Sequence, residues 1–108
     1  MPETGKTLMR LPREYAKGDV IEVRTMIVHP NHNGRVALPG GGYIAEYFIR
    51  KVEVFYGDAR VLTLHASGAL SQNPYFTFML KADRSAPLKV EWEDTKGERY
   101  SHTEEVRA

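Results

Sequence analysis

Cysteine is absent from this 108-residue sequence, and its absence excludes several kinds of chemistry. Without a thiol, the chain cannot form a disulfide framework, a thiolate metal site, an iron–sulfur cluster or a cysteine nucleophile. Four histidines remain as the main candidates for metal binding or acid–base chemistry.

The sequence also lacks an excess of charge of one sign and has no long apolar run. The chain has 15 basic and 14 acidic residues, a formal net charge of +1 and no block of like charges. Nucleic-acid-binding domains carry a basic face or stripe, so we expect no nucleic-acid partner. No apolar run approaches the length of a membrane-spanning helix, and residues 1–19 lack the apolar segment of a secretory signal peptide. The residues alone therefore predict a cytoplasmic protein with no membrane partner.

The sequence does contain many short segments with the period-two alternation of β-strands. Turn residues separate these segments, and the expected strands cover residues 7–11, 20–29, 47–56, 60–66, 75–82, 87–94 and 99–107. No segment has a helical period of useful length. One domain over residues 1–108 is expected, with an all-β fold: an immunoglobulin-like β-sandwich of about seven antiparallel strands.

The alternation also predicts which side chains face the core. The expected inward set is Val52, Val54, Tyr56, Leu62, Leu64, Phe76, Phe78, Leu80, Leu88, Val90 and Trp92. Of these, we expect Phe76, Phe78, Val90 and Trp92 to be mostly buried. His65 has the opposite phase to its leucine neighbours and should lie at the surface, whereas His102 should be half-buried and hydrogen-bonded.

The histidines do not complete a recognisable catalytic or metal site. His29 and His32 lie three residues apart, where an apolar run ends, but two histidines supply only half of a metal site. A serine hydrolase would need a G-x-S-x-G elbow, which is missing. An iron site that reduces superoxide on a β-sandwich would need a cysteine thiolate. We therefore expect no catalytic residue, cofactor or metal, and keep a metal-dependent or hydrolytic sandwich enzyme using loop histidines as the alternative.

The stretch 30–47 is long for a loop in a compact domain, and loops of this length are usually functional or disordered. Among its glycines it contains Val36, Leu38, Tyr43, Ile44 and Tyr47. These apolar groups either fold back on the core or contact a partner. Tyr75 and Met79 fall opposite the core face of their strand, as in an interface, although scattered exposed apolar groups are also common.

The order and spacing of several segments resemble those of the SoxZ family over almost the whole chain. The segments are "LPREYAKGDVIEVRTMIVHPNHNGRV", "GGYIAEYFIRKVEVFYGDARVLTLH", "SGALSQNPYFTFMLKA" with its Asn-Pro-aromatic sequence, and the closing hairpin "LKVEWEDTKGERYSHTEEV". One departure is visible: the family tends to have Met-Glu-Thr where this chain has Asn31-His32-Asn33, so no role is expected for an acidic group there.

The resemblance implies an immunoglobulin-like sandwich that is not an enzyme. It implies one subunit of a thiosulfate-oxidising carrier, in which a SoxY-like subunit holds the sulfur intermediate on a cysteine and other Sox enzymes act on it in turn. This chain would be the scaffold and docking surface, and a homodimer is possible when the carrier is absent. The resemblance also implies export to the periplasm with the carrier, which replaces the cytoplasmic expectation. The predicted partner surface consists of His29, Pro30, Tyr43, Ile44, Tyr47, Asn73, Tyr75 and Met79.

Overall fold

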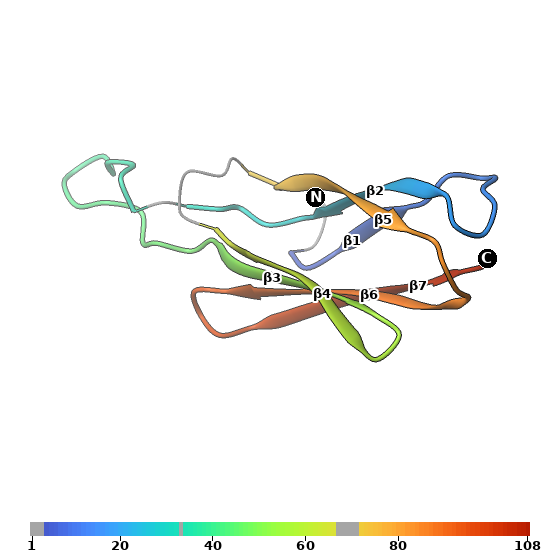
Figure 1. The fold of residues 1–108 in the computed structure, drawn as a ribbon. Coiled ribbons are helices and arrows are strands. Elements are labelled where there is room, and N and C mark those ends of the chain that lie inside the picture. Colours follow the sequence, from blue (N-terminus) through green and yellow to red (C-terminus); the bar gives the residue numbers. More distant parts are fainter. Residues whose placement is uncertain (1–3, 33, 67–71) are drawn as a thin grey trace.

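The computed structural model describes residues 4–32, 34–66 and 72–108, which form seven β-strands and no helix (Figure 1). The strands are β1 (Thr7–Arg10), β2 (Val20–Ile27), β3 (Ile49–Tyr56), β4 (Ala59–His65), β5 (Tyr75–Lys81), β6 (Ala86–Asp94) and β7 (Arg99–Val106). They pair antiparallel in a three-stranded sheet, β1-β2-β5, and a four-stranded sheet, β4-β3-β6-β7. The predicted all-β sandwich is confirmed. Within the described ranges, nothing helical is present that could cross a membrane.

The core lies between the two sheets and follows the predicted alternation. On β6, Leu88, Val90 and Trp92 are buried while the residues between them are more exposed. The burial predicted for Val90 and Trp92 is confirmed. Phe76 and Phe78 pack against this core but are only half-buried, because β5 is an edge strand. The expectation that these two rings are mostly buried is therefore wrong.

Strand β4 has the predicted orientation but little burial. Leu62 and Leu64 pair with Val54 and Val52, so they lie on the core-facing side of their sheet as predicted. They are nevertheless 37% and 39% exposed. The reason is topological: β4 is the outer strand of the wider sheet and packs on β3 alone among the described strands.

The molecule is elongated, with extents of 58 × 25 × 19 Å. The segment between β2 and β3, drawn in cyan and green, extends well beyond one end of the sandwich (Figure 1). Strand β2 ends at Ile27, two residues earlier than predicted. His29 and Pro30 therefore begin the extension and do not close a strand.

Candidate partner-binding surface

His29 is fully buried at the root of this extension. Its Nε2 lies 3.3 Å from Oδ2 of Asp94, and its Nδ1 accepts a hydrogen bond from the backbone N–H of Asn31 at 3.2 Å. The two bonds assign the neutral tautomer with the proton on Nε2. The ring also packs on Tyr47, with ring centroids 4.3 Å apart. As an interior group, the His29 imidazole has no surface to offer a partner in this structure.

Asp94 is the acceptor at the centre of this cluster. It is fully buried, and its carboxylate receives four hydrogen bonds, from His29, the Tyr100 hydroxyl and the backbone N–H groups of Lys96 and Glu98. Burial opposes the charge, but the hydrogen bonds outweigh it and hold the pKa of Asp94 below its usual value. Burial, followed by hydrogen bonds to neighbouring oxygens, raises the pKa of the Tyr100 hydroxyl. A charged carboxylate thus fixes the root of the extension.

Asn73 connects the same root to β5. Its side-chain Oδ1 accepts the backbone N–H of His29 at 3.0 Å, and its own N–H donates to the His29 carbonyl at 2.8 Å. Asn73 and Asn31 both have positive φ values, 51° and 50°, which asparagine tolerates better than most residues. The Oδ1 atom of Asn73, a residue predicted to contact a partner, is therefore already engaged within the chain.

The extension is a loose two-stranded ribbon, which we call the 32–47 ribbon; position 33 is not described. Backbone bonds of 2.7 and 2.8 Å join His32 and Tyr47 at its base, and an isolated bridge joins Ala37 to Tyr43 nearer the tip. Its apolar residues divide into two groups. Val36, Leu38 and Tyr43 are exposed, whereas Ile44 and Tyr47 are half-buried. The ribbon thus fixes its base on the domain and presents its tip to solvent.

The side of the sandwich between β4 and β5 is a second uncovered apolar surface, which we call the open edge. Every residue of β4 is exposed, including Val61, Leu62 and Leu64. Edge strands are usually protected by lysine, proline or inward-pointing charge. Strand β4 has a register shift opposite Val54 and Phe55 but no lysine, proline or charge on its core side, and Phe76 and Phe78 of β5 are only half-buried.

Tyr75 and Met79 lie on the outer face of the three-stranded sheet. They are 74% and 62% exposed, as the alternation of β5 predicts. Tyr75 pairs with Met26 of β2, which pairs in turn with Leu8 of β1. A continuous apolar row therefore crosses this face.

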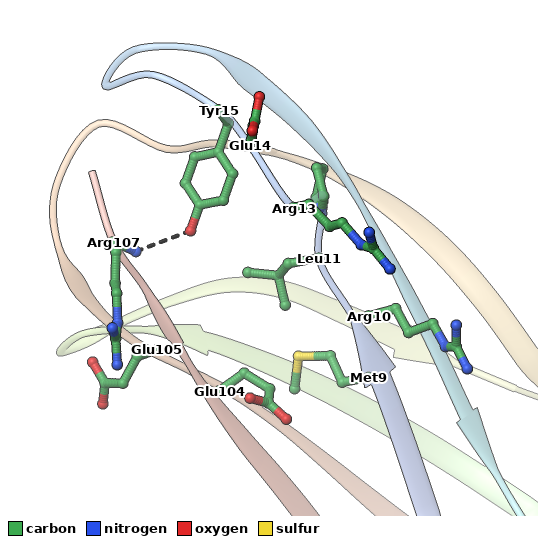
Figure 2. A pocket seen from close by; sticks show the side chains of 10 residues that line it. Met9, Arg10, Leu11, Arg13, Glu14, Tyr15, Glu104, Glu105 and Arg107 are labelled. Carbon is green, nitrogen blue, oxygen red and sulfur yellow. Dashed lines mark hydrogen bonds between the residues drawn. The ribbon is translucent and has the colours of Figure 1, made fainter.

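A pocket of about 690 Å³ lies between the segment after β1 and the end of β7 (Figure 2). Met9, Leu11 and Tyr15 contribute apolar surface, and Glu104 and Glu105 lie along β7. The Tyr15 hydroxyl accepts a hydrogen bond from the backbone N–H of Arg107 at 2.9 Å. The lining of this pocket contains no serine, histidine or cysteine, so the pocket does not present a hydrolytic nucleophile with a base.

The histidines do not converge on a metal site in the part of the chain that the structure describes. No group of three or more His, Asp or Glu side chains there could hold a metal ion. His65 is exposed, and half-buried His102 bonds to Thr7 and Glu104 at 2.8 Å each, as predicted for both. A superoxide-reducing iron site with a thiolate ligand does not fit this donor set, because the chain has no cysteine.

The family model of the sulphur oxidation protein SoxZ matches residues 9–105. The chain belongs to the SoxZ family. The match extends from β1 to β7, so it confirms the resemblance seen in the sequence, and it gives the chain a role in sulfur oxidation. None of the curated proteins matches this sequence.

Three solved structures show how widely this SoxZ fold is shared. A superoxide reductase (neelaredoxin) from Ignicoccus hospitalis has a TM-score of 0.74 and 16% identity, covering 96% of this chain and 80% of that chain. A putative superoxide reductase from Thermotoga maritima has a TM-score of 0.72 and 16% identity, covering 97% and 86%. The sulfur carrier protein SoxY from Chlorobium limicola f thiosulfatophilum has a TM-score of 0.66 and 12% identity, covering 94% and 74%. At these identities the similarity shows the fold alone.

Proposed function

We propose that this SoxZ-family chain is the non-catalytic subunit of a heterodimer with a SoxY-like carrier subunit. In this proposal, a cysteine of the carrier holds the sulfur intermediate of thiosulfate oxidation. Family membership and the absence of cysteine from this chain support a partner role for this chain and a sulfur-carrying role for the other subunit. The shared fold of a SoxY sulfur carrier supports a pairing of two similar sandwiches.

The observation that carries the proposal is the open edge. Strand β4 exposes a row of unpaired backbone groups with Val61, Leu62 and Leu64 beside them. Permanent interfaces are more apolar than transient ones and have few charges at their centre. We therefore assign the open edge to the carrier subunit, with Tyr43 of the 32–47 ribbon as an additional contact.

The proposal includes export to the periplasm and transient contacts with the other Sox enzymes. The heterodimer would reach the periplasm through the export signal of the carrier and would meet the other Sox enzymes there transiently. Without its carrier, the open edge would pair with a second copy of this chain. Cell fractionation with and without the carrier gene tests export: this chain should reach the periplasm only when the carrier is present.

A matched pair of leucine variants tests the assignment of the open edge. Leu62→Lys places a charge in the proposed interface, whereas Leu8→Lys changes a residue of almost equal exposure, 38% against 37%, on the other sheet. Binding to the purified carrier subunit is measured by titration calorimetry. We expect Leu62→Lys to weaken binding by about tenfold or more and Leu8→Lys to leave it unchanged. Equal affinities for both variants and the unmodified chain would overturn this assignment.

A further inference from the structure

The two outer faces of the sandwich balance their charges differently. On the four-stranded sheet, the carboxylates of Glu53, Glu91 and Glu93 are each paired with one or more cations. Five ion pairs of 3.1–3.8 Å serve these carboxylates, and their cations are Lys51, Arg60, Lys89, Arg50 and Arg99. On this face each of these five cations therefore has a carboxylate partner.

The outer face of the three-stranded sheet does not compensate its charges in this way. Its outward-pointing charged residues are Arg10, Arg24 and Lys81, with Glu22 as the one carboxylate of these strands. Arg10 and Arg24 are direct partners in the β1–β2 register, and like charges directly opposite each other destabilise a sheet. Glu22 pairs with Arg24 at 2.9 Å, which leaves Arg10 without a carboxylate among the described residues.

The arginine pair also lines a hollow. A depression of about 360 Å³ is bounded by Arg10, Leu11, Pro12, Glu22 and Arg24. Figure 2 shows the guanidinium groups of Arg10 and Arg13 on the same side of the chain, pointing away from Leu11 and Tyr15. Guanidinium groups present several donors in a fixed fork that matches a carboxylate. Glu22 also lines the hollow and already accepts from the Nε of Arg24, so the donors that remain for an acidic side chain are the guanidinium of Arg10 and the other N–H groups of Arg24.

We propose that this outer face is the docking surface for an acidic patch on the enzymes that act on the carrier. The inference rests on the proposed function and adds the location and chemistry of the enzyme contact. A carboxylate of the enzyme enters the hollow between Arg10 and Arg24, and the row of Leu8, Met26 and Tyr75 forms the apolar centre of the contact.

The charge explains why this face is assigned to enzymes and the open edge to the carrier. Several enzymes must bind and leave in turn, and complementary charge accelerates encounter without requiring a permanent apolar interface. The open edge instead presents aliphatic and aromatic groups on its core side, as a long-lived interface requires. The two surfaces share β5 but use opposite faces of it: Phe76 and Phe78 point to the core side, whereas Tyr75 points outward, so both partners can bind together.

Charge reversal in the assembled heterodimer tests the docking surface. The test variant is Arg10→Glu/Arg24→Glu. The control is Lys89→Glu/Arg99→Glu, which makes the same charge change on the opposite face, where its weak surface ion pairs contribute little. The probe is the purified enzyme that loads thiosulfate sulfur onto the carrier, and the loading rate is followed by mass spectrometry at several NaCl concentrations. Gel filtration and thermal unfolding verify that each heterodimer forms.

At low salt, we expect the enzyme to load the carrier at least about tenfold more slowly in the test heterodimer than in the unmodified one. The loading rate of the test heterodimer should depend little on NaCl, and the control should behave as the unmodified heterodimer does. If Arg10→Glu/Arg24→Glu fails to fold, Arg10→Gln/Arg24→Gln is used and should show a smaller loss in the same direction. Unchanged loading by the test variant would overturn the inference. So would loss of the heterodimer in the folded test variant alone, because the face would then belong to the carrier. Failure of the unmodified chain to bind the carrier would instead refute the proposed function.

Discussion

The imidazole of His29 and the carboxylate of Asp94 meet 3.3 Å apart in the interior, and neither side chain is exposed to solvent. The two residues are 65 positions apart in the sequence. Their contact joins the root of the 32–47 ribbon to the end of β6. The neutral histidine donates and the charged aspartate accepts, so the pair acts as a hydrogen-bonded anchor for the ribbon.

Replacing Asp94 by asparagine should destabilise the domain. The amide would present N–H donors toward the donors on His29 and Tyr100, and a buried hydrogen bond left unmade costs about 1–3 kcal/mol. Urea unfolding followed by circular dichroism measures the change. Asp83→Asn, at an exposed carboxylate 3.8 Å from Arg84, is the control and should stay within about 0.5 kcal/mol of the unmodified chain. Equal stabilities of the two variants would show that the Asp94 carboxylate does not anchor the ribbon.

The same carboxylate predicts how stability depends on acid. The folded-state pKa of Asp94 is lowered from its usual value of 3.8, so the folded state favours its charged form. Its contribution is present above the unfolded pKa and is lost as the pH falls through the folded pKa. The stability gap between the unmodified chain and Asp94→Asn should therefore narrow between about pH 5 and about pH 2. A gap that stays constant over this range would show that Asp94 does not titrate in this way.

The raised pKa of Tyr100 predicts that the domain loses stability as the pH rises into the alkaline range. The pKa of Tyr100 is raised above the usual 10.0, because burial and neighbouring oxygens disfavour the phenolate. The stability that it contributes is present below pH 10 and is lost as the pH rises through the folded-state pKa. Tyr100→Phe should therefore lose less stability than the unmodified chain above pH 10, as measured by urea unfolding at each pH. Parallel losses would contradict the assignment.

Trp92 tests the core directly. It is one of the largest fully buried side chains, so Trp92→Ala should cost about 3–5 kcal/mol in the free energy of unfolding. Circular dichroism is the appropriate probe, because the chain has no other tryptophan to report by fluorescence. A cost below about 1 kcal/mol would mean that β6 packs differently from the arrangement described here.

The sequence was most informative where a strand lies in the middle of a sheet. The alternation of Leu88, Val90 and Trp92 predicted the core face of β6, because β6 has a neighbouring strand on both sides. The same rule gave the correct side for Phe76 and Phe78 of the edge strand β5 but the wrong burial. Alternation reports the direction of a side chain, whereas burial also requires a covering strand, and no local pattern reveals which strand lies at an edge.

The anchor of the ribbon was missed for a related reason. His29 was expected at the end of a strand and in the partner surface, whereas the structure buries it against Asp94, which lies far away in the sequence. One signal was available: Asp94 has the same phase as Leu88, Val90 and Trp92, which places a carboxylate on a core-facing position. A charged residue in that phase needs hydrogen-bond donors, and a histidine side chain can supply one.

The position of the sulfur after loading distinguishes the carrier subunit from its partner. The heterodimer of this chain with a SoxY-like carrier subunit is incubated with thiosulfate and the enzymes that load it, and the intact mass of each subunit is measured. We expect sulfur-derived mass on the carrier subunit, removed by reductant, and no change in the mass of this cysteine-free chain. Sulfur-derived mass on this chain, or loading of a carrier that never associates with it, would refute the proposed heterodimer.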